Sequence, residues 1–383
     1  MFILIVISFL VFAVYAILIE NYRRSWKAMP LYIPDEKIMA TTTTKIAIII
    51  PVRNEENNIK ILLDALSLQS YPKNQYQVIV VDDHSTDGTR DLINSLNYEK
   101  MELRLLNLAD YANDPKIIAH KKLAIETAIG VANAMLIVTT DADCRPRPDW
   151  LQTIAVFHAS THAKLIAAPV KINVTNRFLS IFQTLDFITL QGITGAAVSQ
   201  KIHSMCNGAN LAYEKAAFEE VGGFKGIDQI PSGDDMFLMH KIFKKYPDQV
   251  FFLKNKDAVV LTQSETSWAG FINQRVRWAS KADKYDDKGI FWALLLVYTF
   301  NFLFLILFVA GFWQTQSWLW LITLLLLKTV VEFPFVKSAA LFFEQQNLLR
   351  YFPFLQPLHI LYTIVIGWLG KFGSYKWKGR KIN

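Results

Sequence analysis

Long apolar stretches lie at both ends of the chain, and a region of short alternating apolar and polar runs lies between them. Residues 1–19 form an almost unbroken apolar run that is long enough to cross a bilayer as a helix. Further apolar stretches near the other end occupy residues 290–311, 318–336 and 352–370. We therefore expect an N-terminal transmembrane helix and a C-terminal membrane region with two or three transmembrane helices.

The central region has the pattern of an α/β domain. Short runs rich in β-branched residues predict buried strands at residues 45–50, 76–81 and 134–138. Helical spacing predicts helices that alternate with these strands, at residues 57–68, 86–96 and 121–132. Ser85 or Thr86 is the expected N-cap of the second helix. Such alternation implies a mostly parallel sheet flanked by helices, in which ligands bind outside the carboxyl ends of the strands.

Composition supports a membrane location. The chain is 52% hydrophobic and carries a net charge of +7, and its basic residues lie thickest beside the apolar stretches. That distribution favours attraction to anionic lipid headgroups and phosphate, with no nucleic-acid partner. Arg23, Arg24 and Lys27 follow the first apolar run, so the positive-inside rule puts the central region in the cytoplasm. We expect an uncleaved, multi-pass protein of a bacterial inner (plasma) membrane.

The C-terminal region leaves its topology open. Three full spans after a cytoplasmic centre would put the basic tail, from Lys371 on, outside, whereas the positive-inside rule favours the inside. One apolar segment is therefore expected to be re-entrant or interfacial, and residues 337–351 or 352–370 are the favoured places. Lys328 and Glu332 lie four residues apart in a candidate span, so they share one helix face and are expected to pair.

Carboxylates follow each of the predicted strands. Asp141 and Asp143 stand one residue apart at the end of a strand, where both can reach one hard divalent cation. Asp83 and Glu55 follow the other two strands and are suited to accept hydrogen bonds from a base and a ribose. Cys144, next to the aspartate pair, is expected to be a small buried residue.

Two further motifs follow along the chain. Asp234 and Asp235 stand where a helix is predicted to begin, so one of them can act as a general base, or the pair can stabilise the helix N-terminus. Gln274, Arg277 and Trp278 have the spacing of one helix face, suited to holding phosphate oxygens and a sugar or lipid group. No P-loop and no strand-following G-x-G-x-x-G occurs, so the common nucleotide-binding folds lose their main support.

In this order the motifs resemble those of membrane-bound glycosyltransferase family 2, whose inverting enzymes have the GT-A fold. The resemblance implies an α/β, GT-A-like architecture for the central region. It also implies a site for the uridine part of a nucleotide-sugar at Pro51, Glu55 and Asp83. Lys121 matches a lysine that lies near the phosphates in this family, although His120 replaces the customary glycine before it.

The same resemblance assigns the chemistry. Asp141 and Asp143 are expected to bind Mg2+ or Mn2+, and Asp235, beside Asp234, is expected to be the catalytic base. Asn210 is expected to lie near the donor sugar. The residues of the family's Q-x-x-R-W motif, which closes over the diphosphate and the acceptor, are Gln274, Arg277 and Trp278.

The predicted protein is a membrane-bound inverting glycosyltransferase that moves a hexosyl or N-acetylhexosaminyl group from a nucleotide-sugar donor, expected to be a UDP-sugar, to a membrane lipid or lipid-linked acceptor. A processive polysaccharide synthase, a non-catalytic membrane-tethered nucleotide-binding protein and a metal-dependent phosphohydrolase are the alternatives. The few apolar segments would make a thin wall for a polymer channel, which favours the lipid acceptor. The expected divisions are an anchor at residues 1–21, a juxtamembrane linker at 22–44, a GT-A catalytic domain at 45–285, and a C-terminal membrane region with a basic tail at 286–383.

Overall fold

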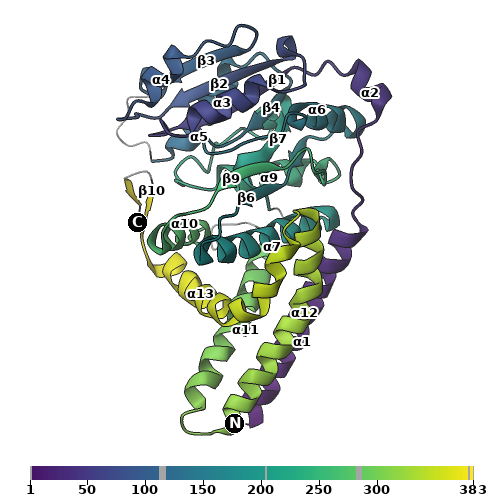
Figure 1. The fold of residues 1–383 in the computed structure, drawn as a ribbon, viewed down its shortest axis with the longest axis vertical. Helices are drawn as coiled ribbons and strands as arrows, with labels where there is room; N and C mark the ends of the chain where they lie inside the picture. Colours follow the sequence, from purple (N-terminus) through teal and green to yellow (C-terminus); the bar gives the residue numbers. More distant parts are fainter. Residues whose placement is uncertain (1, 112–117, 203–204, 282–286, 378–379, 383) are drawn as a thin grey trace. The chain divides into compact units, whose positions relative to one another are not determined.

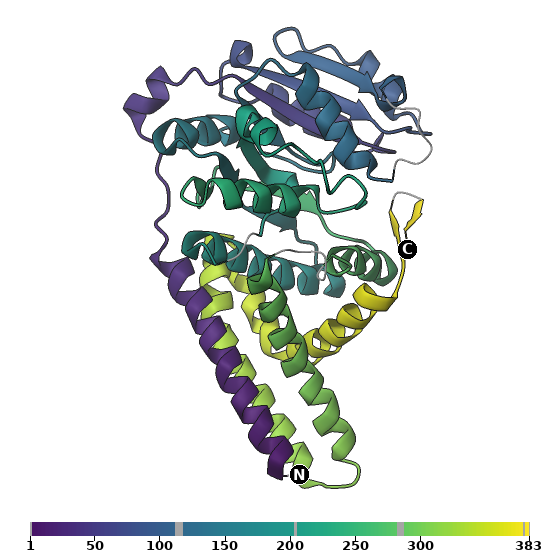
Figure 2. The same cartoon turned by 180° about the vertical axis from the view of Figure 1, so that it is seen from behind.

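The computed structural model describes residues 2–111, 118–202, 205–281, 287–377 and 380–382. The chain forms two compact units, which Figures 1 and 2 show from opposite sides. The helical unit comprises Met1–Met29, Val174–His203 and Ser264–Asn383, and the sheet unit comprises Pro30–Asn173 and Ser204–Gln263. These limits differ from the divisions drawn on the sequence, because residues 174–203 and 264–285 fall in the helical unit. The functional domain limits therefore stay a prediction.

A seven-stranded sheet lies at the centre of the sheet unit, in the order β3-β2-β1-β4-β7-β5-β8. Its first four strands run parallel: β3 (Glu102–Asn107), β2 (Tyr76–Asp82), β1 (Ile46–Val52) and β4 (Leu136–Thr139). β7 (Leu211–Glu214) is antiparallel to both β4 and β5 (Leu165–Ala167), and β8 (Val250–Phe252) is parallel to β5. The mostly parallel sheet that the sequence predicts is confirmed.

Helices flank this sheet (Figure 1): α3 (Ile59–Ser67), α4 (Thr89–Ser95), α5 (His120–Val131) and α6 (Trp150–Thr161), with α2 (Glu36–Thr41), α8 (Lys215–Glu220) and α9 (Asp234–Lys245) in the same unit. Every side chain of β2 is buried, as expected for a central strand that is covered on both faces. A separate two-stranded parallel sheet pairs β6 (Val170–Asn173) with β9 (Val260–Gln263). Cys144 is buried, as predicted.

The start of α4 differs from the sequence prediction. Ser85 or Thr86 is expected to cap this helix, but α4 begins at Thr89, after Gly88, and no side chain in the described part of the chain caps it. Both expected caps bond to an earlier loop instead. The Ser85 hydroxyl accepts a hydrogen bond from the amide of Asn54 (2.9 Å), and the Asn54 side chain accepts one from the amide of Thr86 (2.8 Å). These bonds between two loops override the local capping signal.

The helical unit contains the apolar stretches. Among the described residues, four helices are long and apolar enough to cross a membrane, and the last of them spans residues 346–372. They contain α1 (Phe2–Ala28), α11 (Lys288–Ala310), α12 (Gln316–Phe342) and α13 (Phe352–Phe372). α7 (Phe178–Gln200), α10 (Trp268–Ala279) and the hairpin of β10 (Tyr375–Trp377) and β11 (Arg380–Ile382) complete the unit. α1, α11 and α12 run alongside one another, and α13 is inclined to them (Figures 1 and 2). Whether α13 crosses the bilayer stays a prediction.

A buried polar cluster joins three of these helices. The Lys328 ammonium on α12 donates to Glu332 Oε1 (2.7 Å) and to Gln356 Oε1 on α13 (2.7 Å). Glu332 also accepts hydrogen bonds from the side-chain amide of Gln356 (2.5 Å) and from the hydroxyl of Tyr15 on α1. The predicted pairing of Lys328 with Glu332 is confirmed, and its two further partners come from other helices.

Candidate active site

Lys121 lies between two of the acidic motifs. Its ammonium nitrogen is 2.9 Å from Asp141 Oδ1 and 3.6 Å from Asp234 Oδ2. The lysine stands in the first turn of α5, Asp141 follows β4, and Asp234 is the first residue of α9. Burial acts to lower the pKa of Lys121, but the nearby carboxylates of Asp141 and then Asp234 outweigh it and raise the pKa. Lys121 is therefore a fixed cation within a group of carboxylates.

Asp235 stands next to this group. Its Oδ2 accepts a hydrogen bond from the amide of Gly208 (2.9 Å), and its Oδ1 accepts one from the amide of Met236 (2.8 Å). The carbonyl of Gly208 in turn accepts a hydrogen bond from the Thr139 hydroxyl at the end of β4 (2.8 Å). A Cβ at Gly208 would lie 3.4 Å from both Asp234 Oδ2 and Asp235 Cβ. The Gly208 loop therefore joins the end of β4 to the start of α9 and orients the Asp235 carboxylate.

Asp143 is the second aspartate of the predicted metal pair. Its Oδ2 accepts a hydrogen bond from the hydroxyl of Thr262 on β9 (2.8 Å). Burial, followed by the negative charges of Asp141 and Glu55, raises the pKa of Asp143. A divalent cation would relieve this cost, and carboxylate oxygens are the ligands that Mg2+ and Mn2+ prefer. The residues present therefore fit the predicted metal, and Thr262 is a neighbour that the sequence motif did not indicate.

The residues predicted to bind uridine lie at the ends of β1 and β2. Pro51 is within β1, and the amide of Asp83 donates to the carbonyl of Val52 at the end of that strand (2.8 Å). The Asp83 side chain is 4% exposed. Glu55 Oε2 accepts a hydrogen bond from the side chain of Asn58 (2.9 Å). The charge of Glu55 also contributes to the raised pKa of Asp143, and the predicted nucleoside and metal residues belong to one unit.

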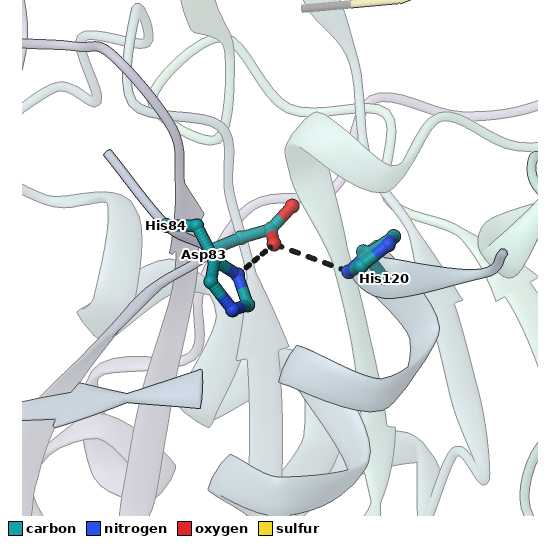
Figure 3. Close-up of side chains that lie close together, drawn as sticks. All are labelled: Asp83, His84 and His120. Carbon is teal, nitrogen blue, oxygen red and sulfur yellow. Dashed lines mark hydrogen bonds and ion pairs between the residues drawn. The ribbon is translucent and has the colours of Figure 1, made fainter. Parts of the chain in front are cut away.

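Two histidines contact Asp83, and the motif-based prediction did not include them. His84 Nδ1 is 3.0 Å and His120 Nδ1 is 3.2 Å from the same oxygen, Asp83 Oδ1, as Figure 3 shows. Arg53 donates to the carbonyl of Asp83 (2.8 Å) and so holds its backbone. The histidine in place of glycine before Lys121 is the one sequence feature that could have indicated this arrangement.

Asn210 is fully buried, and its side chain is engaged within the protein. Its amide donates to the carbonyls of Pro169 and Ala258, each at 2.8 Å, and its Oδ1 accepts a hydrogen bond from the indole of Trp150 (2.9 Å). These bonds tie the start of β7 to neighbouring loops. The predicted contact of Asn210 with a donor sugar stays a prediction, and the bonds give the residue a structural role.

The three Q-x-x-R-W residues lie on one helix, as predicted. Gln274, Arg277 and Trp278 all belong to α10, and the side-chain amide of Gln274 donates to Glu265 Oε1 (3.3 Å). α10 is part of the helical unit, whereas the carboxylates belong to the sheet unit. That these residues act together with the carboxylates therefore stays a prediction.

Arg275, an intervening residue of this motif, is buried. Its guanidinium pairs with Asp186 on α7 (2.8 Å) and lies over the rings of Trp278 (4.1 Å) and Phe271 (5.0 Å). His359 on α13 is 3.7 Å from the other oxygen of Asp186. Arg275 thus holds one side of α10, the side that carries Trp278, in contact with α7.

Comparison with known proteins shows the family to which the chain is similar. The sequence matches the family described as Glycosyl transferase family 2 over residues 47–222 and the one described as Glycosyl transferase family group 2 over residues 136–369. It is 28% identical over 200 residues to Glycosyltransferase AglE of Haloferax volcanii, which covers 52% of this chain and only 61% of that protein. It is 24% identical over 286 residues to the dolichyl N-acetyl-alpha-D-glucosaminyl phosphate 3-beta-D-2,3-diacetamido-2,3-dideoxy-beta-D-glucuronosyltransferase of Methanococcus voltae, covering 68% of this chain and 80% of that protein.

Among solved structures, the mannosyltransferase PcManGT from Pyrobaculum calidifontis in complex with GDP-Man and Mn2+ superposes with a TM-score of 0.59. The sequences are 18% identical, and the superposition covers 95% of this chain and 99% of the other. This likeness confirms the predicted GT-A-like fold.

Proposed function

The chain belongs to glycosyltransferase family 2, and on this premise we propose that it transfers a sugar from a UDP-sugar to a membrane lipid or lipid-linked acceptor, with inversion at the anomeric carbon. The observation that carries the proposal is the position of Lys121 between Asp141 and Asp234, with Asp235 next in the chain. This group combines a cation for phosphate, an oxygen-only metal pair and a candidate base.

The donor side of the site has a role for each residue. Asp83 and Glu55 would accept hydrogen bonds from the base and the ribose, and Lys121 would hold phosphate oxygens. Asp141 and Asp143 would hold Mg2+ or Mn2+, which supplies positive charge for the departing diphosphate when it is bound. The raised pKa of Asp143 supports this assignment, because a carboxylate that is costly to ionise alone gains most from a cation.

Asp235 would act as the general base. Each of its oxygens accepts a hydrogen bond from a backbone amide, so the carboxylate is held in one orientation. It would take the proton of an acceptor hydroxyl, whose oxygen forms the new bond to the anomeric carbon. The bond from that carbon to the nucleoside diphosphate breaks at the same time, and its electron pair leaves with the diphosphate.

A lipid acceptor is supported by the helical unit. Its candidate spans would keep the protein at a bilayer, where a lipid-linked substrate is available. The relative from Methanococcus voltae has a dolichyl-phosphate-linked acceptor in its name. The basic residues after the first apolar run support a cytoplasmic site, and the proposed location is a bacterial inner membrane.

The test uses full-length protein in native membranes with a panel of nucleotide-sugars, followed by mass spectrometry of extracted lipids and gel analysis of larger products. One sugar should appear on a lipid with a UDP-sugar as donor. Asp235→Asn should abolish transfer and spare UDP binding. Asp149→Asn is the matched control, because Asp149 is exposed and its side chain caps nothing.

Each outcome decides between the alternatives. A ladder or polymer would replace the lipid acceptor with a growing polysaccharide. UDP binding without turnover of any donor would favour a non-catalytic nucleotide-binding protein. Continued transfer by Asp235→Asn would remove this residue from the role of base.

A further inference from the structure

Asp83, His84 and His120 bring three metal-ligating atoms together outside the aspartate pair. One ligand atom from each residue lies within 4.8 Å of the other two. Both imidazoles direct Nδ1 to Asp83 Oδ1, at 3.0 and 3.2 Å (Figure 3). The three residues come from the end of β2 and the first turn of α5, so the fold itself holds them together.

The backbone of Asp83 is held by two hydrogen bonds, and both imidazoles are more exposed than its carboxylate. The Asp83 backbone is bonded through its amide to Val52 and through its carbonyl to Arg53, each at 2.8 Å. The side chains of His84 and His120 are 44% and 20% exposed, against 4% for Asp83. His84 has a φ of 57°, a left-handed conformation that few residues other than glycine adopt but that histidine tolerates better than most. The group therefore combines a buried carboxylate with one exposed and one partly buried imidazole.

The spacing of these atoms suits a transition metal. Zinc binds imidazole nitrogen and carboxylate oxygen at about 2.0–2.2 Å, so two ligands on a tetrahedral ion are about 3.3 Å apart. The two contacts to Asp83 Oδ1 already have nearly this length. Imidazole favours zinc and its neighbours, whereas Mg2+ takes oxygen ligands. The ligand set therefore differs in kind from that of Asp141 and Asp143.

We propose that Asp83, His84 and His120 bind a zinc-like transition-metal ion, and that this ion excludes the donor nucleotide by occupying Asp83. The second half rests on the proposed function, in which Asp83 binds the base of the donor. Three protein ligands leave a fourth position for water. Elevated zinc would then inhibit the enzyme in competition with its donor, while Mg2+ or Mn2+ at the aspartate pair would not.

Metal binding is tested directly on the purified full-length protein, stripped with a chelator and kept in millimolar Mg2+ so that hard-ion sites are filled. Zn2+ is titrated by calorimetry, and Co2+ by its visible absorption, whose intensity reports tetrahedral coordination. One equivalent should bind tightly. His84→Asn, which keeps a residue that tolerates left-handed backbone, and His120→Ala should each weaken binding by at least about tenfold. His162→Asn is the control, because His162 is exposed and also left-handed. Equal binding by wild type and both site variants would overturn the metal site.

The competition arm measures UDP binding at several Zn2+ concentrations. The apparent Kd for UDP should rise with Zn2+ for the wild type and for His162→Asn, and should stay constant for His120→Ala. Tight Zn2+ binding with unchanged UDP affinity would overturn the exclusion of the donor and leave the metal site standing. Failure of UDP to bind in millimolar Mg2+ without added Zn2+ would overturn the proposed donor instead, whatever the Zn2+ titration gives.

Discussion

Replacement of Lys328 by methionine should destabilise the helical unit more than replacement of Lys328 and Glu332 together. The single change leaves the Glu332 carboxylate buried, with Gln356 and Tyr15 as its remaining donors among the described residues. Removing one partner of a buried ion pair lowers the free energy of unfolding by about 3–5 kcal/mol. Because two donors to Glu332 remain, the expected loss is about 3 kcal/mol. For a unit of roughly 150–250 residues, each kcal/mol lowers Tm by about 2–4 °C, so Tm should fall by about 6–12 °C.

The double variant Lys328→Met, Glu332→Gln removes both charges and keeps an acceptor for Tyr15. It should unfold within about 1 kcal/mol of the wild type, because neutral replacement of a whole buried pair is often harmless. Thermal unfolding of the protein in detergent, followed by circular dichroism, measures both variants. Lys337→Met, an exposed lysine on the same helix, controls for loss of charge. A double variant as unstable as the single one would refute the argument from an unpaired buried charge.

Three more outcomes are expected from the site and its surroundings. Lys121→Met removes a cation 2.9 Å from Asp141. Mn2+ should therefore bind about tenfold more tightly by calorimetry, while the rate of sugar transfer falls by about a hundredfold or more. Unchanged Mn2+ affinity would contradict the expected repulsion between Lys121 and the metal. Asp143→Asn should stabilise the metal-free protein in urea unfolding near neutral pH, because burial raises the pKa of Asp143 and its charged form costs folding free energy. This advantage over the wild type should shrink as the pH falls from the raised pKa towards the ordinary carboxyl range, where Asp143 is protonated, and a constant difference would exclude Asp143 as its source. Asp186→Asn leaves Arg275 without its paired carboxylate. This change should raise KM for the acceptor more than KM for the donor, and Asp186→Glu should restore KM for the acceptor. Equal increases in both KM values would argue against a specific role near the acceptor.

The three strands that the sequence predicts are largely buried on both faces. β1, β2 and β4 are apolar runs rich in β-branched residues, so their pattern depends little on what surrounds them. β3 lies at the sheet edge and alternates exposed with half-buried positions, and its mixed sequence does not stand out. The antiparallel insertion of β7 beside β4 depends on contacts between distant residues, which no local pattern encodes.

The candidate site divides in the same way. Asp141, Asp143 and Asp235 could be named from sequence because each sits at a strand or helix end within a recognisable motif. The contacts that set their chemistry come from residues far along the chain. Thr262 reaches Asp143 from β9, and the loop at Gly208 orients Asp235. Motifs therefore identify candidate reactive groups, while the residues that contact them are known only from the folded structure.

Three separate segments of the chain belong to the helical unit: one at the start, one between β6 and β7, and one after β9. Trimming the termini leaves α7 in the middle of the polypeptide, so a fragment that contains the whole sheet unit still carries one helix of the helical unit. A version limited to the sheet unit would need residues 174–203 exchanged for a short artificial linker, in addition to deletions at both ends. The same interleaving means that a ribosome synthesises α1 and α7 before the last strands of the sheet unit, so neither unit is completed before the other has begun.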